Sequence, residues 1–390
     1  MGEPHAITHP RFQLRWLLAG RQRYPDWLDD ETWIPPGDRT LFARAKQGLY
    51  AALTAYDSES EGVVLLPAYA PGGVVWAALY AGYDVRYYPV NEDLSLPTAA
   101  VAAQIESHDP AAIVFIHYFG FVDEHFRDLA AIASDVDALV IEDCARGLFS
   151  RDPHGQLLGS TGDVALYCLH KTLPVPNGGL VVSDRLSIPE PDVSRPEWRR
   201  IPQLAALSVA RVGHVPIDHT PTVRRAMNRG VSSVSPPERS SRPGGLTLRA
   251  LSQCRPERVQ SAREGRYRAL ETLLSKRPSL TVVSPPVHCG ASPYGVAALA
   301  PSSAARSRHL RALRSRGLPC EVLTWPPVHE HERVSTFAGA ETLRERLLVI
   351  PTHQQLDPGA IGRMASIVAS GAGLMDPPTQ HTNGAMDQNQ

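Results

Sequence analysis

Two carboxylates directly follow an apolar run of the sequence. Residues 138–143 read Ala-Leu-Val-Ile-Glu-Asp, so a buried strand here would end in Glu142 and Asp143. A carboxylate at the carboxyl edge of a sheet can keep the ring nitrogen of a ligand protonated, which makes that ring an electron acceptor. The ordinary alternative for such a pair is a helix N-cap or a surface pair. The pair by itself leaves both interpretations open.

A lysine lies 28 residues after Asp143, at the end of a second predicted strand. The run from Gly159 to Lys171 begins in a turn and continues through apolar residues to the amine. Such a lysine can condense with an aldehyde and then transfer a proton between carbon atoms. A solvent-exposed lysine is the alternative, but the chain has only three lysines, at 46, 171 and 276, and uses arginine elsewhere. An amine and a carboxylate in one crevice are the groups that pyridoxal 5′-phosphate (PLP) requires.

The residues around this pair alternate between strand and helix patterns. Strands are predicted near 62–67, 84–90, 111–118 and 138–143, and helices near 41–56, 73–82, 98–107 and 125–134. Apolar strands that alternate with helices are typical of a parallel sheet covered on both faces. Ligands of such sheets bind at the carboxyl ends of the strands. We therefore predict an α/β domain with its site beside Asp143 and Lys171.

The remaining segments predict the domain organisation. We expect an N-terminal arm, a large PLP-binding α/β domain, a smaller C-terminal α+β domain and a disordered tail, over residues 1–38, 39–245, 246–372 and 373–390. The small domain is predicted from a long helix near 247–275 and from further helices and strands near 280–284, 295–299, 304–316, 319–324, 347–351 and 358–370. Within the large domain, residues 184–244 are irregular and rich in Pro, Ser and Arg. They are either a functional segment, such as a loop over the site or a subunit-exchange segment, or disordered.

The composition excludes several classes of partner. A net charge of -1 gives no electrostatic footprint for nucleic acid or an anionic membrane, so we expect small-molecule and protein partners. No apolar run reaches the length of a membrane span. Five scattered cysteines without a C-x-x-C pair indicate free thiols in a reducing cytoplasm. His329-Glu330-His331-Glu332 has no evident third metal ligand nearby, so no metal site is predicted.

Several ordered motifs resemble those of a known family. They are Leu65-Leu66-Pro67-Ala68-Tyr69, Ala81-Gly82-Tyr83-Asp84-Val85, His117-Tyr118-Phe119-Gly120, Glu142-Asp143-Cys144-Ala145, the run from Gly159 to Lys171 followed by Gly178-Gly179, and Leu348-Val349-Ile350-Pro351-Thr352-His353-Gln354. Together, over roughly residues 41–368, they resemble the DegT/DnrJ/EryC1/StrS aminotransferase family. That family has the PLP-dependent transferase architecture called fold type I, in the aspartate aminotransferase superfamily.

The resemblance implies roles for particular residues. Lys171 would be the Schiff-base lysine and Asp143 the partner of the pyridine nitrogen, in a homodimer whose sites draw residues from both subunits. Further expected cofactor contacts are Ala45, Lys46 and Gln47 at the phosphate, Tyr69 against the ring, Arg146 at the phenolic oxygen, Cys168 in place of a serine, and His170. Lys46 would supply by charge what a Gly-Thr pair supplies in the family. Asn228-Arg229 is a weak candidate for the neighbouring subunit's phosphate.

The expected function is transfer of an amino group from glutamate or glutamine to the carbonyl of a keto-sugar or specialised metabolite. The altered phosphate and ring contacts keep two alternatives open. One is a PLP enzyme that catalyses elimination, decarboxylation or condensation, and the other is a non-catalytic subunit with the same fold.

Overall fold

The computed structural model of the 390-residue chain describes residues 8–10, 24–56, 62–193, 240–276, 279–325 and 337–370. Several predictions fall outside these residues. They are most of the N-terminal arm, most of the irregular segment 184–244 with Asn228-Arg229, the motif at 329–332 and the tail at 373–390. The proposed domain boundaries stay predictions.

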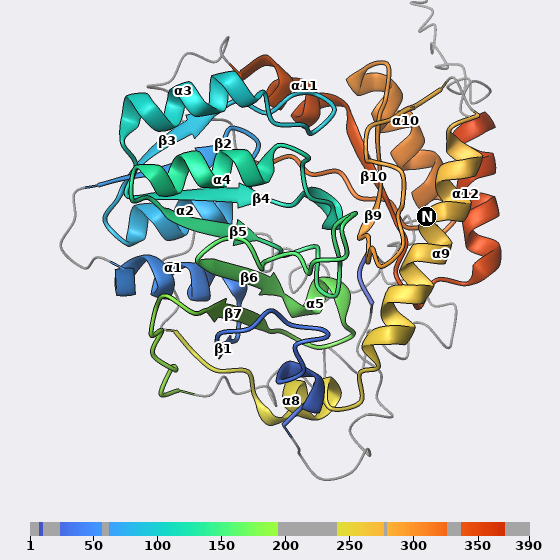
Figure 1. Ribbon diagram of the computed structural model, residues 1–390. Helices are drawn as coiled ribbons and strands as arrows, with labels where there is room; N and C mark the ends of the chain where they lie inside the picture. The colour runs from blue at the N-terminus through green and yellow to red at the C-terminus, as the bar shows by residue number, and fades with distance from the viewer. Residues whose placement is uncertain are drawn as a thin grey trace, which may run out of the picture.

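A seven-stranded sheet forms the larger part of the molecule (Figure 1). Its strands are β1 (Asp38–Phe42), β2 (Val63–Pro67), β3 (Asp84–Tyr88), β4 (Ala112–Ile116), β5 (Leu139–Asp143), β6 (Val164–Cys168) and β7 (Gly179–Ser183). They are arranged in the order β1-β7-β6-β5-β4-β2-β3, and the five strands from β6 to β3 are parallel. β7 and β1 are antiparallel additions at one edge. The prediction of a large, mostly parallel sheet is confirmed.

Helices pack on this sheet in pairs. α1 (Ala45–Tyr56) packs on α2 (Gly72–Tyr80), and α3 (Thr98–His108) packs on α4 (Phe126–Asp135). Connections between parallel strands are right-handed. The connection from β2 to β3 moves one way across the sheet, and the connection from β4 to β5 moves the other way. The helices of these two connections, α2 and α4, therefore lie on opposite faces. The strands are buried on both sides, which explains their continuous apolar sequences.

A three-stranded antiparallel sheet lies in the C-terminal part, beside the helices on the right of Figure 1. Its strands are β8 (Thr281–Val282), β9 (Gly295–Leu299) and β10 (Leu347–Pro351). The accompanying helices are α8 (Gly245–Leu251), α9 (Pro256–Leu274), α10 (Ser303–Arg314), α11 (Ala338–Arg346) and α12 (Pro358–Ser370). A separate apolar core joins β9 and β10 to α9, α10 and α12.

Three local predictions were wrong. The helix predicted over 247–275 is two helices, because Pro256 lacks an N–H and starts α9 as its first residue. The helix predicted from Leu41 begins only at Ala45, since residues up to Phe42 pair with β7 as β1. The predicted strand at 319–324 is reduced to a single bridge between Glu321 and Val349.

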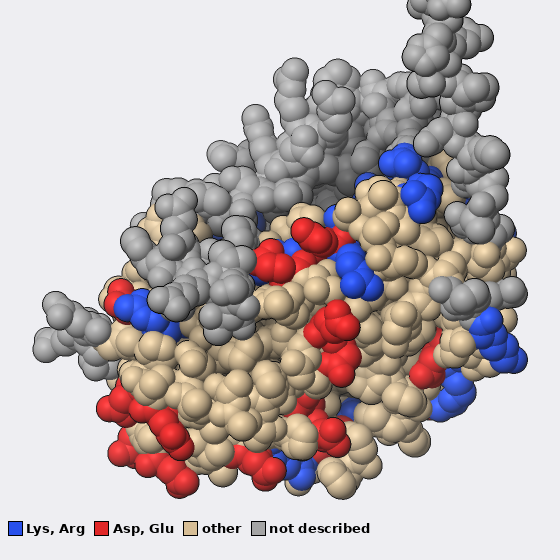
Figure 2. Space-filling model, turned by 90° about the horizontal axis from the view of Figure 1, so that it is seen from above, with Lys and Arg blue, Asp and Glu red and all other residues tan. Residues whose placement is uncertain are grey.

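The described surface is mixed in charge. On the face drawn in Figure 2, acidic and basic side chains lie among neutral ones, in keeping with a net charge of -1. Among the described residues, no helix is both long enough and apolar enough to cross a membrane.

Candidate functional site

Lys171 and Asp143 line one cavity of about 320 Å³. Asp143 is the last residue of β5, and Lys171 lies in α5 (Leu169–Thr172), a short helical turn that follows β6. The strand therefore ends at Cys168, three residues before the lysine that was expected to end it. Because β5 and β6 are parallel neighbours, both segments open at the same edge of the sheet. The structure brings the two side chains together; their roles stay predictions.

The rest of the cavity wall comes from five segments of the sheet domain. They are the start of α1, the start of α2, the ends of β5 and β6, and the loop after α5. The lining residues besides Lys171 and Asp143 are Ala43, Arg44, Ala45, Lys46, Leu49, Pro71, Gly73, Val74, Ala145, Leu166, Cys168, His170, Pro176 and Asn177.

Burial and charge both act on the amine of Lys171. Burial lowers its pKa, and the neighbouring guanidinium of Arg146 lowers it further, whereas Cys168 and Asp143 act in the opposite direction. The net shift is downward, so the neutral, nucleophilic form of the amine is easier to reach than in water. Asp143 is held in place by the backbone N–H of Ala145, which donates to its Oδ1 at 2.8 Å.

The start of α1 gives the cavity a positive end. Ala45 and Lys46 line it as the sequence suggests, and Arg44, which the sequence analysis missed, lines it too. The helix N-terminus adds partial positive charge from the backbone N–H groups of its first turn. Gly179 lets β7 approach this end closely, because a Cβ there would lie 2.4 Å from the backbone nitrogen of Ala45. Gln47, the third predicted contact, lines a small neighbouring cavity beside Trp76 and Tyr80 instead.

Tyr69 does not line the cavity. Its ring is fully buried and lies against the rings of Tyr118 and Trp325, with centroids 5.9 and 4.5 Å away. Its hydroxyl donates to the carbonyl of Leu323 at 3.0 Å, which ties the end of β2 to the C-terminal part of the chain. The side chains on this wall of the cavity are Pro71 and Val74.

Arg146 lies in an aromatic box next to the cavity. Its guanidinium carbon is 5.9, 5.0 and 5.3 Å from the ring centroids of Phe119, Tyr294 and Trp325. Its Nη2 is 3.6 Å from Glu321, and among the described residues its buried Nε has no hydrogen-bond partner. Arg146 and Asp143 line the same narrow space of about 10 Å³. A cation is thus placed beside the carboxylate that ends β5.

A hydrogen-bonded chain extends from Glu321 to the N-terminal residues. The hydroxyl of Tyr294 donates to Oε2 of Glu321 at 2.7 Å, and Nδ1 of His9 lies 2.7 Å from the same hydroxyl oxygen. Burial lowers the pKa of His9 to about 4, so its ring is neutral near pH 7 and donates from Nδ1. These three residues are far apart in sequence, and no local pattern predicted them.

Arg263 of α9 holds the backbone that carries Lys171. It is fully buried, and its Nη2 donates to the carbonyls of Lys171 and Thr172, both at 3.2 Å. Its Nη1 donates to the carbonyl of Pro293 at 3.1 Å. Gln354 supports the same turn by donating to the carbonyl of Thr172 at 2.9 Å. Residues of the C-terminal part therefore fix the position of α5.

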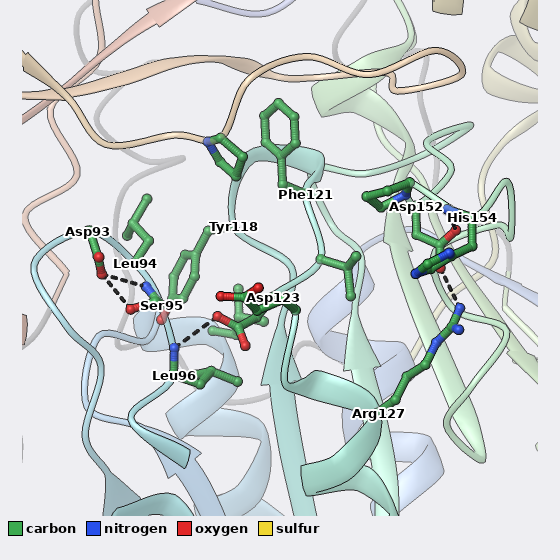
Figure 3. A pocket seen from close by; sticks show the side chains of 15 residues that line it. Asp93, Leu94, Ser95, Leu96, Tyr118, Phe121, Asp123, Arg127, Asp152 and His154 are labelled. Atoms are coloured by element: carbon green, nitrogen blue, oxygen red, sulfur yellow. Dashed lines mark hydrogen bonds and ion pairs between the residues drawn. The ribbon is translucent and has the colours of Figure 1, made fainter.

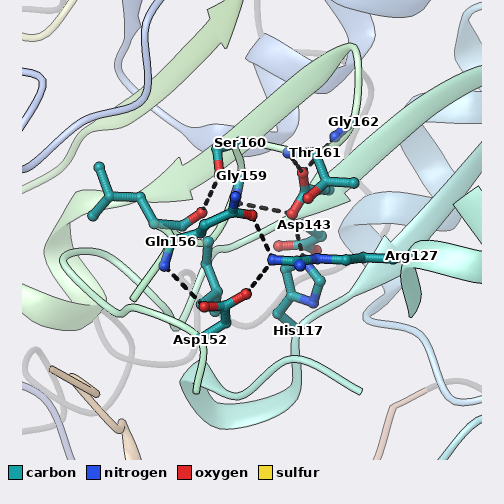
Figure 4. A network of polar contacts seen from close by, with 12 residues as sticks. His117, Arg127, Asp143, Asp152, Gln156, Gly159, Ser160, Thr161 and Gly162 are labelled. Atoms are coloured by element: carbon teal, nitrogen blue, oxygen red, sulfur yellow. Dashed lines mark hydrogen bonds and ion pairs between the residues drawn. The ribbon is translucent and has the colours of Figure 1, made fainter. Parts of the chain in front are cut away.

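Glu142 supports the turn before β6, of which Figure 4 labels Gly159, Thr161 and Gly162. Its carboxylate accepts the backbone N–H groups of Gly159, Thr161 and Gly162 at 2.9, 2.8 and 2.6 Å. His117 Nε2 lies 2.6 Å from Oε2 of Glu142. His117, Glu142 and Cys144 are near enough to hold a metal ion, but the carboxylate and the imidazole already satisfy each other. The Glu142 cluster is therefore a structural support, and its neighbour Asp143 is the residue that faces the cavity.

A larger cavity of about 420 Å³ lies away from Lys171 (Figure 3). Its carboxylates accept hydrogen bonds from nearby loops. Asp123 accepts the backbone N–H groups of Leu96 and His125, and Asp93 accepts the backbone N–H and the hydroxyl of Ser95. Asp152 pairs with Arg127 and caps its own turn. These acidic groups are satisfied within the protein, so the smaller cavity with Lys171 is the candidate site.

The sequence model of the DegT/DnrJ/EryC1/StrS aminotransferase family matches residues 42–189, which hold β2 to β7 and both principal site residues. The chain is also similar to Protein MosB from Rhizobium meliloti, with 28% identity over 158 residues. That match covers 39% of this chain and spans 30% of the length of the relative.

Two solved structures show the fold over almost the whole chain. The aminotransferase TlmJ from Streptoalloteichus hindustanus has a TM-score of 0.67 at 18% identity, with 94% of this chain and 99% of that chain covered. PseC from Helicobacter pylori, an aminotransferase involved in the biosynthesis of pseudoaminic acid, has a TM-score of 0.67 at 15% identity, with 95% and 99% covered. At these identities the similarity shows the fold alone.

Proposed function

We propose that this chain, whose residues 42–189 match the sequence model of the DegT/DnrJ/EryC1/StrS aminotransferase family, is a PLP-dependent aminotransferase that uses Lys171 and Asp143. The observation that carries the proposal is the cavity that these two residues share at the carboxyl edge of the sheet. A buried amine with a lowered pKa and a carboxylate are the two groups that this chemistry requires.

The residues of the cavity fit the cofactor at both ends. Arg44, Lys46 and the start of α1 would hold the phosphate by charge and by backbone N–H groups. Asp143 would pair with the pyridine nitrogen. The Nε of Arg146, which has no partner within the described part of the chain, suits an oxygen of the cofactor or substrate. When bound, PLP supplies an aldehyde for the amine and a ring that accepts electrons.

The chain's own side chains then have separate tasks. Lys171 takes up and returns a proton at Nζ, which its lowered pKa favours near neutral pH. The guanidinium of Arg146 lines the same narrow space as Asp143, and the carboxylate of Glu321 pairs with that guanidinium. Arg263 and Gln354 keep the Lys171 turn in position. Burial of these groups excludes water, which strengthens each electrostatic interaction.

The substrates are proposed from the family and its relatives. Glutamate or glutamine would donate the amino group, and the carbonyl of a keto-sugar or a specialised metabolite would accept it. The similarity to PseC supports an acceptor of this kind. The cytoplasm remains the expected location.

We also propose a homodimer with shared active sites. Leu79 and Tyr80 of α2 are 44% and 45% exposed, which is unusual for large apolar side chains. Tyr80 and Trp76 lie next to Lys46, so a second subunit on this surface would reach the phosphate end of the cavity.

The half-reaction with the amino donor tests the proposed activity. Protein loaded with PLP is mixed with glutamate or glutamine, and the oxo-acid product and the released cofactor are measured by mass spectrometry. We expect one oxo-acid and one pyridoxamine 5′-phosphate per active site with one of the donors. Bound PLP that neither donor converts would favour another PLP reaction, and a folded chain that takes up no PLP would favour the non-catalytic subunit.

A further inference from the structure

Cys168 and His170 form a thiol–imidazole pair inside the candidate cavity. Cys168 is the last residue of β6, and His170 follows it in α5. The sulfur lies 3.3 Å from Nδ1 and 3.6 Å from Nε2 of the imidazole. Both side chains line the 320 Å³ cavity together with Lys171. The aminotransferase reaction proposed above uses no thiol.

The surroundings of Cys168 differ from those of the other cysteines. Burial raises the pKa of the Cys144, Cys254 and Cys320 thiols, and Cys289 is exposed. Burial also raises the pKa of Cys168, but the positive charges of His170, Lys171 and Arg146 outweigh it and lower the pKa to about 7. Arg44 and Lys46 of α1 line the same cavity and add to the positive environment. A thiolate, not a thiol, is the form that reacts with electrophiles.

We propose that Cys168 is a modification site for soft electrophiles, open while the cavity holds no PLP and shielded once PLP fills it. The shielding rests on the proposed function, whereas the reactivity of the pair does not. With an alkyl halide, the Cys168 sulfur forms a bond to carbon, the carbon–halogen bond breaks, and halide leaves. The thiol proton passes to His170 and then to solvent.

This reactivity would have a consequence for the cofactor. An adduct on Cys168 occupies the space beside Lys171, so modified protein is expected not to take up PLP. Loaded protein would be protected from the same reagent. Cofactor binding and thiol modification would thus exclude each other at one cavity.

Alkylation kinetics of the full chain test the proposal. PLP-free and PLP-loaded protein are treated with iodoacetamide between pH 6 and 9, and the adduct at each cysteine is quantified by peptide mass spectrometry. In PLP-free protein we expect rapid alkylation of Cys168, with a rate half-maximal near pH 7. PLP should slow this alkylation at least about tenfold and leave the rate at Cys289 unchanged. Cys144 and Cys320 should stay unmodified, which reports an intact fold.

Two variants separate the pair from the cavity. His170→Asn should slow alkylation of Cys168 at pH 7 by up to about 50-fold, if the pKa returns to near 9 and the thiolate fraction falls accordingly. Cys168→Ser should remove the adduct and make PLP uptake insensitive to iodoacetamide. The proposal is overturned if Cys168 stays unmodified in PLP-free protein while Cys289 reacts, or if PLP-loaded protein reacts equally fast. A chain that binds no PLP would defeat the proposed function, and its alkylation profile would still decide the reactivity of Cys168.

Discussion

Among individual residues, Lys46 marks the main departure from the family pattern, because it stands where the family has a Gly-Thr pair that binds the cofactor phosphate. It stands at the second position of α1 and lines the cavity that holds Lys171. A lysine binds phosphate as a compact charge, whereas the family pattern uses a hydroxyl and backbone N–H groups. The phosphate end of this site should therefore depend on side-chain charge.

We predict that Lys46→Gln weakens PLP binding by about 10- to 100-fold, because a charge-assisted hydrogen bond contributes about 1.5–3 kcal/mol. Titration of the protein with PLP, followed by absorbance, measures the dissociation constant. Lys276→Gln is the matched control, since Lys276 is exposed and far along the chain from the cavity. Equal affinities for the two variants would remove Lys46 from the phosphate site.

The sequence allowed prediction of some site residues and not of others. Asp143 and Lys171 could be predicted because Asp143 ends one apolar segment and Lys171 closely follows another, and parallel strands bring such ends together. Arg44 was missed because one more arginine in an arginine-rich chain carries no signal of its own. His9, Tyr294 and Glu321 come together only through the tertiary fold, which no local pattern encodes.

At the level of the elements, Arg263 of α9 connects the two parts of the chain. Within the described part of the chain it contacts backbone carbonyls and the side-chain oxygen of Gln354 but no carboxylate, which is uncommon for a buried arginine. Burial lowers the pKa of its guanidinium to about 10. It remains charged at neutral pH, and it satisfies the carbonyls at the end of α5. The position of α5 thus depends on a helix that lies about 90 residues further along the chain.

We predict that Arg263→Met lowers the free energy of unfolding by about 2–4 kcal/mol, because buried carbonyl groups lose their donor. Urea denaturation followed by circular dichroism measures the change. Arg268→Met on the same helix should change it by less than about 0.5 kcal/mol, since Arg268 forms an exposed pair with Glu264. If the two substitutions had the same effect, the network around Arg263 would not support α5.

Helices and strands could be predicted where their apolar residues recur regularly along the whole element. β9, β10 and α12 lie where the pattern placed them, since each has a continuous buried face. Two of the three errors came at Leu41 and Pro256. Leu41 continues the apolar pattern of the helix that follows, but it lies in β1 and pairs with Leu180 of β7. Pro256 lies inside the long helical pattern, but it is the first residue of a new helix, α9.

For the whole molecule, the cavity lies at the edge of the large sheet and close to the exposed apolar end of α2. Lys46 lines both the cavity and the small hollow beside Trp76 and Tyr80. If a second subunit covers this surface, dimer formation and cofactor binding should be linked.

We predict a solution mass of about twice 42.5 kDa by light scattering. Tyr80→Glu should shift the protein toward the monomer and weaken PLP binding, because it places a charge in the proposed interface. Leu273→Glu, at an exposed position of α9, should change neither property. A wild-type protein that is monomeric and still binds PLP would refute the shared site.

The most direct test of the central claim is the absorbance spectrum of the purified protein with PLP, compared with that of Lys171→Ala. The account predicts a visible band that depends on Lys171 and that is lost in the variant, while circular dichroism shows an unchanged fold. It also predicts that Lys276→Ala keeps the band, since Lys276 does not line the cavity, whereas Lys46 and Lys171 do. A wild-type protein without the band, or a Lys171→Ala protein that retains it, would contradict the assignment of Lys171.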